Sequence, residues 1–149
     1  MAGLCAGLVL RDAGCAVEIF EKSSREMQER GAGLVVQDEV LNFVIDHCRA
    51  IADELGVRSR ARQLLARDGS VIWSEAGLQL MTSWDALYRY LKRAFPQAHY
   101  HNGTRLAAIR QDTERVYVGL EKDRERTCDL LVEVSEDANL SPPSPARVA

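Results

Sequence analysis

The chain opens on a helix and a strand that match the second half of a βαβ unit. Small and aliphatic residues from Gly3 to Ala13 favour a helix that packs closely on a sheet, and Gly14 supplies its stop. The β-rich run from Ala16 to Phe20 is typical of a strand in a parallel sheet, and Glu21 closes it. The first strand is absent, and only Met1-Ala2-Gly3 remains of the glycine-rich loop that leads into such a helix. This order predicts an α/β fold with a partial Rossmann-like unit.

The composition fits an ordinary globular chain and excludes several kinds of partner. Its 149 residues are 46% hydrophobic and 28% charged, with a net charge of −3. Basic residues are mixed among acidic ones, so we expect binding neither to nucleic acid nor to a membrane surface. The apolar run from Leu4 to Leu10 is too short to span a bilayer.

The cysteines indicate a reducing compartment. There are four of them, Cys5, Cys15, Cys48 and Cys128, scattered without the spacing of a metal site. We therefore expect a cytoplasmic protein with no metal centre.

Periodicity and turn signals predict further elements along the chain. We expect helices over residues 38–47, with Asp38 able to cap the start, and 83–95, capped by Thr82 or Ser83. The pair Asp68-Gly69 predicts a hairpin with a type I′ turn between residues 63–67 and 71–74. Strands are then expected over residues 99–101, 105–111, 116–120 and 127–132, as a meander that returns to the sheet. We expect one domain over residues 1–132 and a disordered tail over 133–149.

Two short segments carry residues suited to a nucleotide. A carboxylate at Glu21, at the end of the second strand, can accept hydrogen bonds from both hydroxyls of an adenosine ribose, although a solvated acid is the simpler alternative. In Arg30-Gly31-Ala32-Gly33-Leu34 the glycines would let the backbone lie against a bulky ligand, and Arg30 could pair with a phosphate. An ordinary flexible loop would look the same.

The order of these segments resembles a known enzyme family. The sequence I-F-E-K-S at Ile19–Ser23, R-G-A-G-L at Arg30–Leu34, T-S-W-D-A-L-Y-R-Y-L at Thr82–Leu91 and the strand meander occur as in the FAD-dependent aromatic hydroxylases. The 2,6-dihydroxypyridine 3-monooxygenase-like branch looks most similar, including its tryptophan at the position of Trp84. The resemblance implies an FAD-binding fold of the para-hydroxybenzoate hydroxylase type, with a small antiparallel meander.

The resemblance also assigns residues to the cofactor. Gly3 would be the last glycine of the phosphate loop and Glu21 the ribose ligand. The remaining residues that it places beside FAD are Lys22, Arg30, Gly31, Gly33 and Gln37. In this family NAD(P)H reduces the flavin and oxygen is transferred to a small aromatic substrate, so the cofactor carries the chemistry. No side chain of this sequence is an evident acid–base catalyst, and the catalytic residues are unknown.

The resemblance stops abruptly near Val132. The family continues into a G-A-D-G turn that binds FAD, whereas this sequence has Glu133 and Ser135 in the first glycine and aspartate positions. With the missing first strand, this predicts a chain truncated at both ends, with weak or no flavin binding and no hydroxylation.

Two other functions remain open at this point. One is a non-catalytic nucleotide-binding or interaction module that associates with a complete homologue. The other is a nicotinamide-dependent reductase without flavin.

Overall fold

The computed structural model describes residues 1–24, 33–122 and 124–134. The chain divides into two compact units, Met1–Glu26 with Phe95–Ala149, and Met27–Ala94. The elements of the first unit are α1 (Ala2–Asp12), β1 (Ile19–Glu21), the short 3-10 helix η1 (Gln97–His99), β5 (Tyr100–Asn102), β6 (Leu106–Gln111), β7 (Val116–Leu120) and β8 (Arg124–Cys128). Those of the second are β2 (Gly33–Val36), α2 (Asp38–Cys48), α3 (Ala52–Leu55), β3 (Val57–Leu65), β4 (Val71–Ser83) and α4 (Trp84–Ala94).

Among the described residues, no helix is both long and apolar enough to cross a membrane.

The first helix and strand follow the predicted order. After α1 the chain turns at Gly14, whose φ of +88° is accessible to glycine, and Cys15 N–H donates to the carbonyl of Leu10. Strand β1 begins at Ile19 rather than at the predicted Ala16, and it pairs in parallel with β5. The prediction of a parallel, Rossmann-like strand pair is therefore confirmed, with a shorter strand.

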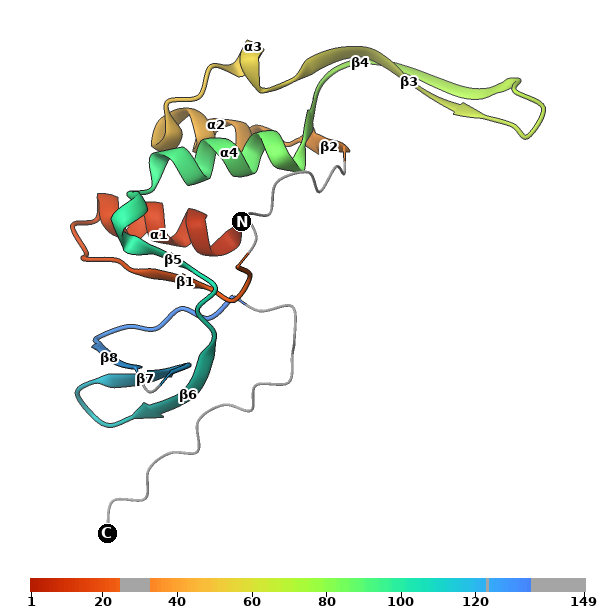
Figure 1. Cartoon of the computed structure of the whole chain (residues 1–149). Helices are drawn as coiled ribbons and strands as arrows, with labels where there is room; N and C mark the ends of the chain where they lie inside the picture. The colour runs from red at the N-terminus through yellow and green to blue at the C-terminus, as the bar shows by residue number, and fades with distance from the viewer. Residues whose placement is uncertain (25–32, 123, 135–149) are drawn as a thin grey trace. The chain divides into compact units, whose positions relative to one another are not determined.

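Successive residues of β1 face two different layers. The side chain of Ile19 lies against α1 at Gly7, where an added Cβ would be only 2.9 Å from Ile19 Cδ1. Phe20 points to the opposite face, as alternation in a strand requires, and packs on the apolar side of the meander. Figure 1 shows α1 and the meander on opposite sides of β1 and β5. The short parallel pair is thus the middle layer of its unit.

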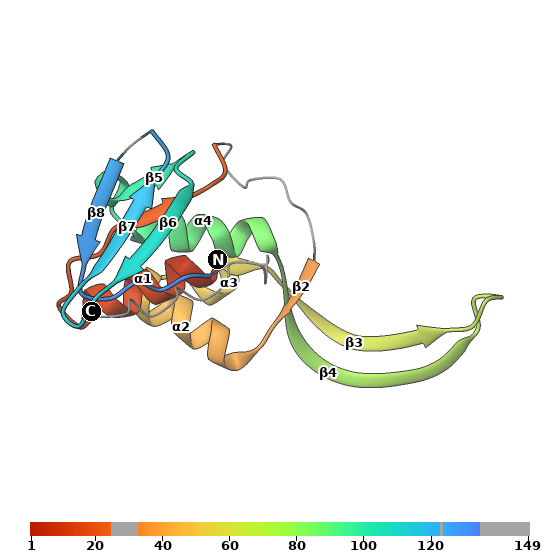
Figure 2. The ribbon, with the colours of Figure 1, turned by 90° about the horizontal axis from the view of Figure 1, so that it is seen from below.

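The meander forms a three-stranded antiparallel sheet of its own, β6-β7-β8, rather than an extension of the parallel pair. Figure 2 shows its strands side by side. The core consists of Val116, Val118 and Leu120, which alternate along β7 with outward-facing residues. The last strand was predicted over 127–132, and this is wrong because β8 runs from Arg124 to Cys128. Most side chains of β8 are exposed, so its sequence shows no apolar alternation. The limits of the strand follow instead from its backbone pairing with β7.

In the second unit, two helices pack against each other beside the sheet β2-β4-β3. Helix α4 begins as predicted, because the hydroxyl of Ser83 accepts a hydrogen bond from Ala86 N–H at 3.1 Å. Its buried face includes Leu87 and Leu91, as the spacing predicted. The predicted cap of α2 is wrong: Asp38 is the first helical residue, and the capping position belongs to Gln37, whose side chain makes no capping bond.

The predicted hairpin is present but is longer and has a different turn. Strands β3 and β4 form a curved two-stranded ribbon (Figure 2), well beyond residues 63–74. A type I′ turn needs positive φ at both central residues, and here Gly69 has φ +87° while Asp68 does not. Instead, Asp68 Oδ1 accepts hydrogen bonds from the N–H and the hydroxyl of Ser70, and Gly69 N–H donates to the carbonyl of Ala66. The turn is therefore stabilised by the side chain of Asp68 as well as by the positive φ of Gly69.

The start of β3 offers a sharp test of the second unit. A Cβ built on Gly56 would overlap the carbonyl oxygen of Met81, and neither backbone can move away without breaking the pairing between the strands. We expect Gly56→Ala to lower the free energy of unfolding by about 3 kcal/mol in urea denaturation.

The matched control is Gly77→Ala in β4. Nothing lies within 4 Å of the Cβ position of Gly77, so we expect a change of about 0.5 kcal/mol or less. Equal effects of the two substitutions would contradict the close approach at Gly56.

Candidate functional site

The amino end of α1 is open and suited to an anion. The helix has no acidic residue in its first turn, and no heavy atom lies within 4 Å of the Cβ position of Gly3. The first N–H groups of a helix lack intrahelical partners and carry the positive end of its dipole, which favours negative charge. The chain reverses direction between α1 and β1, so α1 begins at the end of the unit where β1 finishes (Figure 1).

Glu21 is the last residue of β1 and is half-buried. Its carboxylate oxygen Oε1 accepts a hydrogen bond from Ser23 N–H at 2.9 Å. Its backbone carbonyl accepts one from Thr104 N–H, also at 2.9 Å. The carboxylate therefore has a defined orientation at the carboxyl end of parallel strands, which is where ligands bind in α/β sheets.

The other predicted residues are divided between the two units. Lys22 is exposed and follows Glu21 directly. Gly33 begins β2 with open space at its Cβ position, and Gln37 exposes its side chain at the start of α2. Arg30 and Gly31 lie outside the described residues. The structure thus brings Gly3, Glu21 and Lys22 into one unit, and Gly33 and Gln37 belong to the other.

Sequence reasoning missed the residues that hold Glu21. Ser23 orients its carboxylate, and the turn at Gly103 and Thr104 binds the backbone around it. The pair Asn102-Gly103 has the composition of a turn and nothing more. Nothing local to either segment indicates that the two meet, because their contact depends on the parallel pairing of Glu21 with Asn102.

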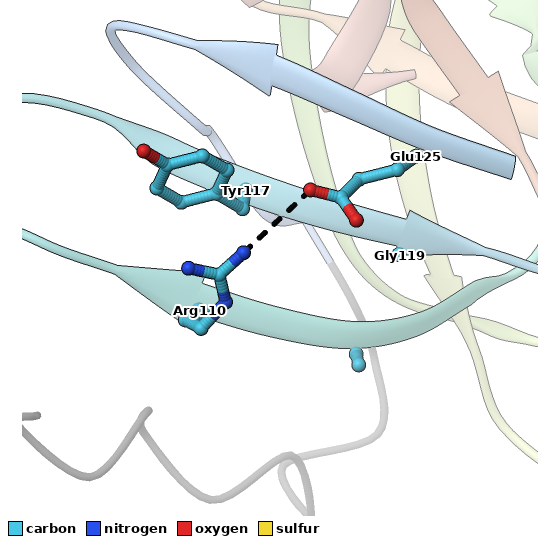
Figure 3. Close-up of a pocket in the computed structure, with 5 residues that line it drawn as sticks. Arg110, Tyr117, Gly119 and Glu125 are labelled. Atoms are coloured by element: carbon cyan, nitrogen blue, oxygen red, sulfur yellow. Dashed lines mark ion pairs between the residues drawn. The ribbon is translucent and has the colours of Figure 1, made fainter.

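A shallow hollow of about 100 Å³ lies on the outward face of the meander (Figure 3). It is lined by Arg110, Tyr117 and Glu125, together with Ala108 and Gly119. The guanidinium of Arg110 lies 4.1 Å from the centre of the Tyr117 ring, and its Nη2 is 3.7 Å from Glu125 Oε1.

The hollow is distinct from the surroundings of Glu21. Its charged groups pair with each other, and it faces away from the side of the meander on which Phe20 packs. These features assign no cofactor role to the hollow.

Comparison with known proteins agrees with this geometry. No protein-family profile matches the chain. The 2,6-dihydroxypyridine 3-monooxygenase of Paenarthrobacter nicotinovorans is 32% identical over 117 residues, which are 78% of this chain and 29% of that protein. The structure of 2,6-dihydroxypyridine-3-hydroxylase from Arthrobacter nicotinovorans matches with a TM-score of 0.77 and 29% identity, over 85% of this chain and 32% of the other. The chain resembles one part of the FAD-dependent aromatic hydroxylases. The prediction from its motifs is confirmed.

A more distant structure supports the fold of this family. HpxO of Klebsiella pneumoniae, crystallised with FAD and uric acid, matches with a TM-score of 0.69 at 18% identity, over 86% of this chain and 35% of that one. The partial FAD-binding fold with a small antiparallel meander is therefore confirmed. The chain spans about a third of the length of these hydroxylases.

The turn between β6 and β7 generates a titration test. Asp112 accepts hydrogen bonds from the backbone N–H groups of Glu114 and Arg115 and from the Tyr117 hydroxyl, and these lower the pKa of its carboxyl. The hydrogen bond to Asp112, and then its negative charge, raise the pKa of Tyr117. We expect Asp112→Ala to bring the pKa of Tyr117 down toward the ordinary value of a tyrosine, measured by ultraviolet absorbance with Tyr117→Phe as the reference.

Asp112→Asn separates the two causes. It keeps an oxygen that can accept the hydroxyl proton but removes the charge, so the pKa of Tyr117 should fall by less than in Asp112→Ala. An unchanged tyrosine titration in both variants would contradict the contact.

Proposed function

We propose that this chain is the FAD-binding portion of an NAD(P)H-dependent flavin monooxygenase that hydroxylates an aromatic or heteroaromatic substrate. The observation that carries the proposal is the half-buried carboxylate of Glu21, held at the carboxyl end of β1 in a chain related to FAD-dependent hydroxylases. The portion extends over residues 1–132, and residues 133–149 lie outside the family pattern.

The described residues fit the adenosine half of FAD. Glu21 would accept hydrogen bonds from the ribose hydroxyls, since a carboxylate has acceptor capacity beyond its bond to Ser23 N–H. The open amino end of α1, with Gly3 in its first turn, would face the pyrophosphate, and the exposed Lys22 would supply positive charge.

The remaining cofactor contacts are carried over from the family. Arg30, Gly31, Gly33 and Gln37 would border the rest of FAD. Bare backbone at Gly33 and the exposed amide side chain of Gln37 are compatible with that role. When bound, the flavin would accept reducing equivalents from NAD(P)H and react with oxygen, while the protein orients it and limits access of water.

We further propose that this chain does not hydroxylate by itself. It spans about a third of the length of its relatives, and where the family resemblance implies a G-A-D-G turn the sequence continues with Glu133-Val134-Ser135. A complete site would need a second set of contacts to the flavin and a pocket for the ring of the substrate. We also propose a reducing, cytoplasmic location, in which the thiols of its cysteines stay reduced.

The cofactor role of Glu21 is tested by titrating the purified chain with FAD. We expect weak binding, with a dissociation constant above about 10 μM, and about tenfold weaker binding in Glu21→Gln because the charged acceptor is lost. Flavin fluorescence measures both.

The matched control is Glu114→Gln, an exposed carboxylate in the turn between β6 and β7, which should leave the affinity unchanged. Equal affinity of the chain and Glu21→Gln would contradict the role of Glu21. A tight, stoichiometric yellow complex would contradict weak binding.

Inactivity is tested separately. With FAD, NADH or NADPH, oxygen and 2,6-dihydroxypyridine, we expect the chain to form no hydroxylated product above the level of heat-denatured protein, measured by chromatography. The physical reason is that a site enclosing flavin and substrate together would need more of the fold than the proposed portion. Product formed in proportion to the amount of chain would overturn this proposal.

A further inference from the structure

We propose that Gly103 is a positioning residue for Glu21: the turn Asn102-Gly103-Thr104 holds the carboxylate in the orientation that binds the adenosine ribose. This inference rests on the proposed function. It adds to the nucleotide site a second segment, Asn102–Thr104, which is distant from Glu21 in the sequence.

The turn binds the loop after β1 at two points. Thr104 N–H donates to the carbonyl of Glu21 at 2.9 Å, and Gly103 N–H donates to the carbonyl of Ser23 at 2.9 Å. These bonds directly follow the parallel pair of Glu21 with Asn102. The backbone from Glu21 to Ser23 is therefore fixed on one side by the end of β5.

The bound loop in turn fixes the carboxylate. Ser23 N–H donates to Glu21 Oε1 at 2.9 Å. Ser23 therefore makes both contacts: its N–H orients the side chain of Glu21, and its carbonyl accepts the hydrogen bond from Gly103. Gly103 thus acts on Glu21 through Ser23, and it does not need to touch the carboxylate itself.

Position 103 requires glycine for two independent reasons. Its φ of +60° lies in the left-handed region, which side chains disfavour. A Cβ at this position would also lie 3.3 Å from Ser24 Cβ, which is a tight contact, and 3.5 Å from Ser24 Cα, which is an ordinary van der Waals distance. To accept a side chain here, the loop after β1 would have to shift by a few tenths of an ångström.

The turn itself is anchored from the opposite side. Thr104 is buried, and its hydroxyl donates to the carbonyl of Asn102 at 3.4 Å. Arg124 Nη2, at the start of β8, donates to the same hydroxyl oxygen at 3.4 Å. Because Arg124 at the start of β8 also binds the turn, we expect strain at Gly103 to be shared with the loop that carries Ser23.

A fixed carboxylate binds more tightly than a mobile one because less conformational entropy is lost on binding. One oxygen of Glu21 is already set by Ser23, so the remaining acceptor sites are directed in advance at the ribose hydroxyls. Loss of this preorganisation should appear as a loss of recognition of the hydroxyls, not as a general loss of nucleotide affinity.

The test compares ADP with 2′,3′-dideoxy-ADP, which lacks both hydroxyls. For the full chain we expect a preference for ADP of about tenfold, measured by calorimetry or by NMR titration. Gly103→Ala should reduce the preference to about twofold, near the value for Glu21→Gln. Affinity for 2′,3′-dideoxy-ADP should stay within about twofold of that of the unaltered chain, whereas a purely structural defect would weaken both nucleotides together.

Gly14→Ala is the matched control. Gly14 belongs to the same unit and also has positive φ, at +88°, but its Cβ position is open, and its N–H donates to the carbonyl of Arg11 rather than to the loop after β1. The same backbone conformation is therefore disfavoured in this variant, and the preference for ADP should be unchanged. A full preference in Gly103→Ala, or an equal loss in Gly14→Ala, would overturn the proposal.

A milder variant covers the case in which Gly103→Ala does not fold. Asparagine tolerates positive φ better than alanine, so Gly103→Asn should retain more of the preference for ADP than Gly103→Ala, and more folded protein. Complete loss of the preference in a folded Gly103→Asn, with unchanged binding of the loop to the turn in its NMR spectrum, would overturn the proposal.

A second measurement separates this inference from the proposed function. If the chain binds neither nucleotide, the proposed function fails, and hydrogen exchange at Ser23 N–H then decides the positioning role in the free protein. Exchange should accelerate about tenfold in Gly103→Ala and remain unchanged in Gly14→Ala. Unchanged exchange in Gly103→Ala would overturn the inference.

Discussion

The two-sided packing of β1 is the constraint on which the rest of its unit depends. A parallel strand pair as short as β1 and β5 has little stability of its own and must be covered on both faces. Ile19 meets α1 at Gly7, where the absence of a side chain lets helix and strand approach closely, and Phe20 meets the apolar side of β7. The three consecutive residues Ile19, Phe20 and Glu21 therefore contact, in turn, a helix, a sheet and the loop that carries Ser23.

The elements that could be predicted from the sequence are those specified by local chemistry. Helix α4 was predicted because the Ser83 cap and the apolar spacing of Leu87 and Leu91 lie within one segment. Strand β8 was misplaced because its residues are mostly exposed, and only backbone pairing with β7 defines them. The turn at Asp68-Gly69 was assigned the wrong type because Asp68 uses its side chain to bind Ser70, which the dipeptide alone does not reveal.

The same distinction applies to the candidate site. Glu21 could be predicted because its spacing from the helix and its position after a strand are local features, and the structure places it at the end of β1. Ser23 and Gly103 could not, since their roles arise only when β1 and β5 pair. Gly7 is similar: a glycine inside a helix gives no signal until the strand that it faces is known. Sequence patterns thus identify the candidate ligand-binding group better than the groups that support it.

The ribbon of β3 and β4 has a consequence for the chain in concentrated solution. Apolar side chains including Leu64, Ile72 and Trp73 are exposed along it, and among the described residues only β2 pairs with its outer edges, near the end of β4. Unpaired strand edges with exposed apolar residues are templates for association between copies of a protein. Arg58 and Arg62 pair with Asp53 and Glu75, but the exposed Arg60 and Arg67 add positive charge to the ribbon of each copy and oppose that association. The tendency of the chain to aggregate should therefore be governed by ionic strength, because salt screens the charges that keep these edges apart.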